Sequence, residues 1–397
     1  MLEPHFVWPQ ISRETTDAVL QQLMESISIY DRSGVIERLE DKLADYMDAR
    51  YAVLTNSGTS AIHASYIAAG LSTGDEVIVP NYTFFATVSP IYQTGAVPVF
   101  VDCDDCGGIE PGLVERKIGP KTKAIVVTHM WGIPAQIHWL RELADKHNLV
   151  LIEDISHAFG ATTCGKPIGS MGDIAVQSLQ AQKPLTGGEG GVLYTNNPEF
   201  YYRTIAAAHY NKRCKNEIPE DHALHQYALT GFGLKWRIHP LAAAICEQQL
   251  ASFSSVMAGR ERVARFMLDE LSQLKGISPI TPRRNDTSSW YSLVLKVNPE
   301  EVGGNNALSI AENLNARGAT EVDVPNSTRP LTDIEMFRNP GGLFPGYETP
   351  HPSVKEKYPN SDYLASNLLK IPVWNSLEGE AHAAEYIRIF KETWKNL

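Results

Sequence analysis

Seven short apolar runs in the first 200 residues constrain the fold of this chain more than any other feature. Each run is rich in β-branched residues, and most are followed by a turn and a stretch with helical spacing of apolar side chains. Several runs are apolar at nearly every position, which is typical of strands covered on both faces in a mostly parallel sheet. The pattern therefore predicts a doubly wound α/β sandwich. The runs are residues 51–57, 75–80, 97–102, 123–129, 149–154, 173–179 and 190–195.

The pattern changes near residue 250. A long segment with helical spacing, residues 248–274, leads into isolated strand-like runs such as 290–297 and into connections rich in Pro and Gly. A chain of 397 residues is also long enough for two domains. We therefore predict a large domain over residues 1–250 and a smaller α+β domain over residues 251–397.

Composition argues against several classes of protein. The chain has 35 Lys and Arg against 46 Asp and Glu, and it lacks a basic run long enough to bind nucleic acid. No uninterrupted apolar stretch approaches the roughly 20 residues of a membrane span, so we expect a cytoplasmic protein without a membrane partner. Five cysteines do not suggest a disulfide framework. Cys103 and Cys106 have the spacing of a metal or redox motif, but they lack a second pair, and we expect no metal site.

Polar residues follow two of the runs, at the edge where open parallel sheets bind ligands. Residues 56–61 (NSGTSA) place small residues at a helix start, where free N–H groups suit either a phosphate or an ordinary N-cap. Asp154 ends the fifth run. It is either another N-cap or the partner of a cation or a protonated ring nitrogen. His157, three residues later, is either structural or directed toward the same ligand.

A single lysine, Lys183, precedes a loop with four glycines in the segment SLQAQKPLTGGEGG. A lysine over a buried site loses solvation, which lowers its pKa and leaves more of the free amine that forms Schiff bases with carbonyl compounds. Taken singly, a surface role is the safer interpretation. The order of helix start, strand-end Asp and loop Lys nevertheless matches the parts of a site for pyridoxal 5'-phosphate (PLP).

Several linked segments resemble the DegT/StrS sugar aminotransferases, and the resemblance extends from about Tyr30 to Val373. It implies fold type I of the PLP-dependent transferases, with a mostly parallel seven-stranded sheet, and PLP as cofactor. Within the family, the chain is most similar to the branch that aminates keto-cyclitols such as scyllo-inosose. The expected reaction moves an amino group from L-glutamine or L-glutamate to a keto-cyclitol or keto-sugar in aminocyclitol antibiotic biosynthesis. The segments include NSGTSA, VLIEDISHAFGA, SLQAQKPLTGGEGG, LKWRIHP, NSTRPL and LKIPV.

The resemblance also implies roles for individual residues. Lys183 stands at the position of the Schiff-base lysine, and Asp154 at that of the partner of the pyridine nitrogen. Phe84 stands where the family stacks an aromatic ring on the cofactor, although a core aromatic is the alternative. His157 replaces a commoner Gln near the cofactor's phenolic oxygen. The phosphate positions and the adjacent strand end are occupied by Gly58, Thr59, Ser60, Ser178 and Gln180.

Lys235 stands where the family commonly has an Asn that reaches the phosphate of the neighbouring subunit. The resemblance therefore implies a homodimer with shared active sites. A charged loop that is merely solvated is the alternative for Lys235 and Arg237, as it is for Arg329. The expected substrate contacts are Tyr30, Trp131, Arg237, His239 and Arg329.

Three other functions stay open on the sequence. The same mechanism could act on a nucleotide-diphospho keto-sugar, or the site could serve another reaction such as epimerisation or elimination. The fold could also belong to a ligand-sensing regulator, which the net charge of −11 and the presence of Lys183 disfavour. Lys183 argues against the family's sugar dehydratases, because they have a histidine at this position.

Overall fold

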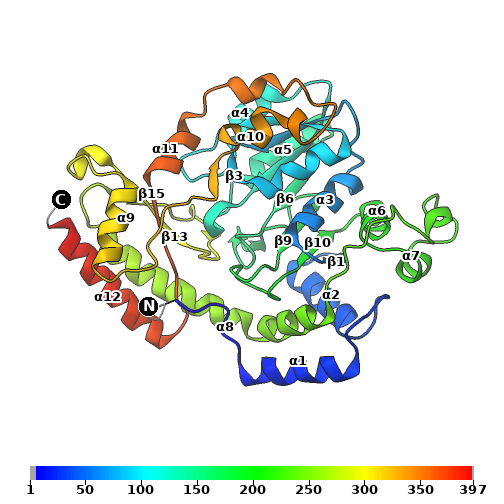
Figure 1. Cartoon of the computed structure of the whole chain (residues 1–397), viewed down its shortest axis with the longest axis horizontal. Coiled ribbons are helices and arrows are strands. Elements are labelled where there is room, and N and C mark those ends of the chain that lie inside the picture. The colour runs from blue at the N-terminus through cyan, green and yellow to red at the C-terminus, as the bar shows by residue number, and fades with distance from the viewer. Residues whose placement is uncertain (1–5, 396–397) are drawn as a thin grey trace.

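The computed structural model describes residues 6–395 and contains the predicted seven-stranded sheet. The strand order is β1-β10-β9-β6-β5-β2-β4, and β10 is the strand that runs antiparallel to both of its neighbours (Figure 1). The α/β fold class is therefore confirmed, and each of the seven predicted runs overlaps a strand of this sheet. The strands are β1 (Tyr51–Thr55), β2 (Glu76–Pro80), β4 (Val97–Val101), β5 (Thr122–Thr128), β6 (Val150–Asp154), β9 (Ile174–Ser178) and β10 (Gly191–Thr195).

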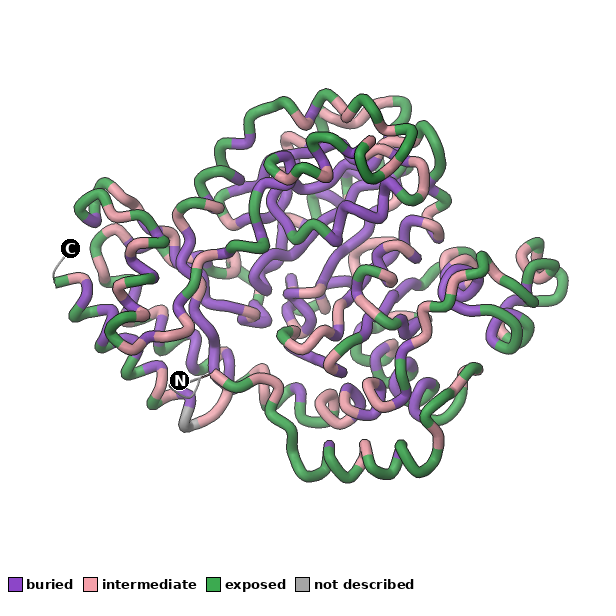
Figure 2. The backbone as a smooth tube through the Cα atoms, in the orientation of Figure 1, coloured by how far each residue is buried: buried purple, intermediate pink, exposed green. Residues whose placement is uncertain are grey.

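Both faces of this sheet are covered by apolar side chains, as the continuous apolar runs predict. Successive strand residues alternate between two buried clusters, because strand side chains point to opposite faces in turn. In β5, for example, Ile125 lies in one cluster and Val126 in the other. The first cluster includes residues of α2 (Gly34–Met47) and α5 (Ile137–His147), and the second includes residues of α3 (Gly58–Ala68). Figure 2 shows the strands as the most continuously buried part of the chain.

A second, three-stranded antiparallel sheet lies in the C-terminal part, in the order β11-β13-β15. Its residues share a third buried cluster with the helices packed against it. This sheet with its helices is the predicted smaller α+β unit. Its elements are β11 (Ile277–Pro279), β13 (Leu293–Val297), β15 (Leu368–Ile371), α9 (Ala307–Ala316) and α12 (Leu377–Trp394).

One long helix, α8 (Pro240–Leu271), belongs to both units. Its first half contributes Ala243 and Phe253 to a cluster of the large sheet, and its second half contributes Val263 and Met267 to the cluster of the small sheet. Figure 1 shows α8, in green, running along one side of both units.

The chain then returns to the large unit. Strand β14 (Thr328–Pro330) pairs with β3 (Tyr82–Phe84), and Phe337 and Tyr358 are buried in a cluster of the large sheet. The division at residue 250 stays a prediction. We propose that the boundary lies within α8 and that residues 328–358 belong to the large unit.

The remaining helices and strands lie around these two units. Helix α1 lies outside the sheet and packs along α8 (Figure 1). Within residues 6–395, no helix combines the length and apolar character that crossing a membrane requires. These elements are α1 (Arg13–Glu25), α4 (Pro111–Lys117), α6 (Pro198–Ala208), α7 (Lys212–Glu217), α10 (Glu335–Arg338), α11 (Pro359–Asn367), β7 (Thr162–Thr163), β8 (Lys166–Pro167) and β12 (Asp286–Thr287).

Candidate active site

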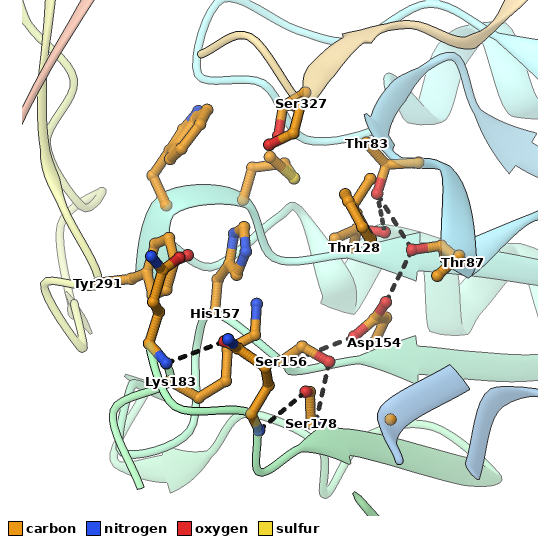
Figure 3. Close-up of a pocket in the computed structure, with 18 of the residues that line it drawn as sticks. Thr83, Thr87, Thr128, Asp154, Ser156, His157, Ser178, Lys183, Tyr291 and Ser327 are labelled. Atoms are coloured by element: carbon orange, nitrogen blue, oxygen red, sulfur yellow. Dashed lines mark hydrogen bonds between the residues drawn. The ribbon is translucent and has the colours of Figure 1, made fainter. Parts of the chain in front are cut away.

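A cavity of about 470 Å³ lies at the carboxyl ends of the parallel strands. The ends of β5, β6 and β9 contribute Thr128, Asp154 and Ser178 to its wall, and the start of α3 contributes Gly58. This is the edge where open α/β sheets bind ligands. In Figure 3, Lys183 and Tyr291 lie on one side of the cavity and Thr83, Thr87 and Thr128 on the other.

Asp154 is the last residue of β6 and is buried. Its Oδ2 accepts a hydrogen bond from the Thr87 hydroxyl at 2.8 Å, and its Oδ1 accepts one from the Ser156 N–H at 3.0 Å. Thr83 extends the hydroxyl network, with 3.2 Å to Thr87 Oγ1 and 3.0 Å to Thr128 Oγ1. A carboxylate oxygen has two lone pairs, so Asp154 keeps capacity for a donor in the cavity. The network fixes the carboxylate without using up that capacity.

Lys183 lies on the loop between β9 and β10 and is half-buried. Its Nζ is 5.0 Å from the centre of the Tyr291 ring. Burial lowers the pKa of Lys183 to about 8, with a contribution from the charge of Lys370, whereas Asp154 acts in the opposite direction. A larger fraction of the amine is therefore free and nucleophilic near neutral pH than for a solvated lysine.

The start of α3 meets the end of β9 at very close range. A Cβ on Gly58 would lie 2.6 Å from the Cβ of Ser178, so the close approach requires glycine. Ser57 caps the helix by accepting a hydrogen bond from the Ser60 N–H. The first N–H groups of a helix lack intrahelical acceptors and favour an anion. Together with the hydroxyl of Thr59, which also lines the cavity, this corner is suited to a phosphate group.

An aromatic wall closes another side of the cavity. The ring of His157 stacks on that of Tyr291, with centres 3.9 Å apart and planes within 7°. Trp131 is buried next to them, with its ring centre 5.8 Å from that of His157. Burial, with the charges of Lys183 and Lys370, holds the pKa of His157 well below its usual value. His157 is therefore neutral near pH 7.

Two features of this wall point to a bound group, an unpartnered polar atom and a strained backbone. The Nδ1 atom of His157 is buried and lacks a hydrogen-bond partner among the described residues. Such orphaned polar atoms are uncommon in native proteins and call for a ligand or water. Trp131 has φ of +60°, a strained conformation for a bulky residue, and strain of this kind clusters at functional sites.

The structure brings most of the predicted cofactor residues together around this cavity. Phe84 on β3 lines it with an exposed ring, and Trp131, a predicted substrate contact, lines it too. Their roles remain predictions. The predicted residues that line the cavity are Gly58, Thr59, Phe84, Trp131, Asp154, His157, Ser178, Gln180 and Lys183.

Other predicted residues lie outside the cavity of this single chain. The Ser60 hydroxyl donates to Asn56 Oδ1 at 2.7 Å. His239 caps α8, with its Nδ1 accepting from the Leu241 N–H at 3.2 Å. Lys235 is exposed on the loop before α8. The resemblance implies that Lys235 reaches the site of a second copy of the chain, and this role stays a prediction.

The remaining three predicted substrate contacts are also outside this cavity. Tyr30 is exposed, and the Nζ of Lys212 lies 4.5 Å from its ring centre. The guanidinium of Arg237 lies 5.8 Å from the ring centre of Tyr210. Arg329 is exposed on β14, paired in register with Thr83. Their predicted roles stay open.

Several cavity residues were not predicted from the sequence. Thr87 lies three residues after the predicted Phe84, and Lys370 lies in LKIPV, a segment that carries the resemblance, but no local pattern distinguishes either residue. Tyr291 lies in a predicted strand run. The missed residues discussed above are Thr83, Thr87, Thr128, Ser156, Tyr291 and Lys370.

Comparisons with known proteins agree with this geometry. The chain is 29% identical over 363 residues to the GDP-perosamine synthase of Vibrio cholerae, with 90% of each chain covered. It is 33% identical to the L-glutamine:2-deoxy-scyllo-inosose aminotransferase of Streptomyces kanamyceticus, over 79% of this chain and 75% of that protein. The crystal structure of an aminotransferase from Psychrobacter cryohalolentis superposes with a TM-score of 0.86 and 28% identity, covering 99% of both chains.

The profile of one protein family matches residues 10–387, which is nearly the whole chain. The match spans both sheets and every residue that lines the cavity. The chain therefore belongs to the DegT/DnrJ/EryC1/StrS aminotransferase family.

Proposed function

We propose that this PLP-dependent aminotransferase transfers an amino group from L-glutamine or L-glutamate to a ketone on a free, sugar-like ring, either a keto-cyclitol or a keto-sugar. The observation that carries the proposal is the convergence of Lys183 and Asp154 on one cavity with the start of α3. These three parts supply a nucleophilic amine, a carboxylate and an anion site.

The residues around the cavity fit PLP. Bound PLP supplies an electron sink for the charge left on the donor's Cα when its proton is removed. In our proposal Asp154 accepts a hydrogen bond from the protonated pyridine nitrogen, and the first N–H groups of α3 hold the phosphate with Ser178. Phe84 covers one face of the ring. The unpartnered Nδ1 of His157 is available to the phenolic oxygen.

Lys183 has two tasks in this proposal. Its amine would hold the cofactor, and once free, the same amine would remove the proton from the donor's Cα. Both tasks require the uncharged amine. Burial together with the charge of Lys370 favours the uncharged form, which is why the pKa of Lys183 falls to about 8.

The lining of the cavity favours an acceptor without a nucleotide. Diphosphates are commonly bound by paired arginines. Among the described residues, the lining contains lysines but no arginine, and Arg237 and Arg329 lie outside it. The similarity to the S. kanamyceticus inosose aminotransferase supports the same choice.

A nucleotide-diphospho keto-sugar is the second candidate acceptor. The V. cholerae relative, named a GDP-perosamine synthase, aligns over 90% of both chains and supports this alternative. The two candidates differ in whether an anionic tail must be accommodated beyond the ring.

A screen with isotope-labelled donor tests the proposal. The enzyme is incubated with L-glutamine labelled with ¹⁵N at the α-amino group and with keto-cyclitols, free keto-sugars or nucleotide-diphospho keto-sugars, and products are analysed by mass spectrometry. We expect ¹⁵N in a free cyclitol or sugar product. Labelling of nucleotide-linked sugars alone would favour the second candidate. An altered product without ¹⁵N would indicate epimerisation or elimination instead.

A further inference from the structure

Lys370, on β15 of the small unit, is the second lysine that lines the cavity. Four lysines of the described chain are half-buried, and two of them, Lys117 and Lys296, form ion pairs with carboxylates. Lys183 and Lys370 have no carboxylate within ion-pair distance in residues 6–395, and both face the cavity. A partly desolvated cation without a counterion destabilises the folded protein. Here both such cations lie in the cavity proposed to bind the substrates.

The backbone holds Lys370 in a fixed place. Its N–H donates to the Asp323 carbonyl at 2.7 Å, and its carbonyl accepts from the Asp323 N–H at 3.0 Å. On its other side it pairs in register with Val294 of β13. Its neighbours Leu369 and Ile371 are fully buried in the core of the small unit. Because side chains alternate along a strand, Lys370 points away from that core.

The charge of Lys370 acts on the groups at the centre of the cavity. It contributes to the lowered pKa of both Lys183 and His157. The carboxylates of the lining do not neutralise it. Asp154 is hydrogen-bonded to Thr87 and Ser156, and Asp323 is exposed and accepts from the Val324 N–H at 2.8 Å. The exposed Glu189 is likewise beyond ion-pair distance. The small unit therefore presents Lys370 to the cavity as a cation without an ion-pair partner among the described residues.

We propose that Lys370 binds the carboxylate of the amino-acid donor. This inference rests on the proposed function, because the donor's amine must reach the position of the Lys183 amine. The donor's carboxylate is attached to the carbon that carries the amine, so it lies within a few ångströms of that position. A keto-cyclitol or free keto-sugar has no anionic group there. Lys370 thus discriminates in favour of the donor in one half of the reaction and is not required for charge pairing in the other.

The test measures the two half-reactions separately. Single turnovers of the PLP-loaded enzyme are followed through the cofactor's absorbance, first with L-glutamine or L-glutamate and then with the acceptor. For Lys370→Met we expect the apparent dissociation constant of the donor to rise roughly 10- to 100-fold, the worth of a charge-assisted hydrogen bond. The apparent dissociation constant of the acceptor should change less than about threefold. Lys370→Arg should recover much of the donor affinity.

Lys296→Met is the matched control. Lys296 lies on the neighbouring strand β13, but its Nζ donates to the Asp105 carbonyl at 3.2 Å, away from the cavity. This variant should bind donor and acceptor as the wild type does. A direct reading without turnover comes from calorimetric titration of the PLP-loaded protein with glutarate, a dicarboxylate that has no amine. Lys370→Met should weaken glutarate binding by the same factor as donor binding.

Two results would overturn the assignment. Unchanged donor affinity in Lys370→Met would show that Lys370 does not bind the donor's carboxylate. Equal weakening of donor and acceptor would mean that Lys370 supports the cavity structurally, or binds an anion of the acceptor. Failure of the proposed function is distinguishable from either result, because the wild-type enzyme itself would then fail to react with amino-acid donors or with the free keto-cyclitols and keto-sugars.

Discussion

At the scale of single residues, Asp154 is held by contacts that leave it a further lone pair for a ligand. Thr87 and Ser156 each donate one hydrogen bond to it. An amide in its place would present similar shape but no negative charge. The distinction between holding PLP and activating it can therefore be tested at this one position.

For Asp154→Asn we expect retained PLP and turnover reduced at least about 100-fold, because an amide does not stabilise a protonated pyridine nitrogen as a carboxylate does. Bound cofactor is measured by absorbance, and turnover by product formation under saturating PLP. A variant with bound PLP and nearly wild-type turnover would show that another group stabilises the ring nitrogen.

Lys183 predicts a pH-dependent stability in the cofactor-free protein. Its pKa is about 8 when folded and about 10.4 when unfolded, so the folded state disfavours the charged amine. The resulting loss in the free energy of unfolding is complete below about pH 8, becomes smaller as the pH rises toward about 10.4, and is absent above that pH. Lys183→Met should therefore melt at a higher temperature than the wild type at pH 7, and the difference should shrink toward pH 10.

Thermal unfolding of the cofactor-free proteins between pH 7 and pH 10 measures this effect. The exposed Lys166 supplies a control, since Lys166→Met removes a solvated charge. A difference between Lys183→Met and the wild type that stays constant across this range would mean that packing, and not the charge of Lys183, accounts for it.

At the scale of elements, the contact between α3 and β9 depends on one missing side chain. In Gly58→Ala the new Cβ would lie 2.6 Å from Ser178 Cβ and 2.9 Å from its Cα, so the helix start must move. We expect a loss of about 1–3 kcal/mol in the free energy of unfolding, as for other overpacked sites, and weaker PLP binding. Urea titration and equilibrium dialysis of PLP provide the two measurements.

Gly112 in α4 offers the matched control. The nearest atom to a Cβ placed there is Glu110 Oε1 at 3.6 Å, which is an ordinary contact. Gly112→Ala should leave both stability and PLP binding intact or slightly improved. If Gly58→Ala behaves in the same way, α3 is not held against Ser178 as tightly as the structure indicates.

The elements of the large sheet could be predicted from sequence because each strand has a continuous apolar pattern of its own. Positions at or after strand ends single out Asp154 and Lys183 as candidates, and the resemblance adds Ser178 and the predicted roles of all three. Tyr291 and Lys370 could not be found in this way. Their places at the cavity depend on how the small sheet docks against the large one, and packing between residues so distant in sequence leaves no local periodicity.

The residues next to Thr87 in the sequence also give no sign of its hydrogen bond to Asp154. Thr87 lies in a short 3-10 helix, η1 (Phe85–Thr87), and its hydroxyl meets a carboxylate 67 residues further along the chain. The contact arises from the order of the neighbouring parallel strands β2, β5 and β6. The apolar runs predict a mostly parallel sheet but not this strand order.

At the scale of the whole molecule, exposed apolar side chains gather on two segments. Helix α1 exposes Leu20, Leu23 and Met24, and the loop before α8 exposes Leu229 and Phe232. Exposed apolar groups of this kind often mark protein interfaces. Lys235 lies in the same loop. We propose that these segments take part in the homodimer that the resemblance implies, in which Lys235 reaches the partner's site.

Mixing two inactive variants tests the shared site. Lys183→Ala and Lys235→Ala chains are combined under conditions that exchange subunits, and hybrid dimers should regain activity because one of their two sites carries both wild-type residues. The test presupposes that Lys235→Ala alone is inactive. Activity is compared with each unmixed variant, and exchange is verified by mass spectrometry of differently tagged chains. Verified hybrids without activity would mean that Lys235 acts within its own chain or not at all.

Helix α8 has a consequence for attempts to alter what this enzyme accepts. Its 32 residues, about 48 Å at 1.5 Å per residue, are embedded in the cores of both units, and residues 328–358 thread back into the first. A C-terminal half transplanted from a relative would have to match two foreign interiors at once. New acceptor specificity is thus more accessible through point changes in the lining of the cavity than through recombination of halves.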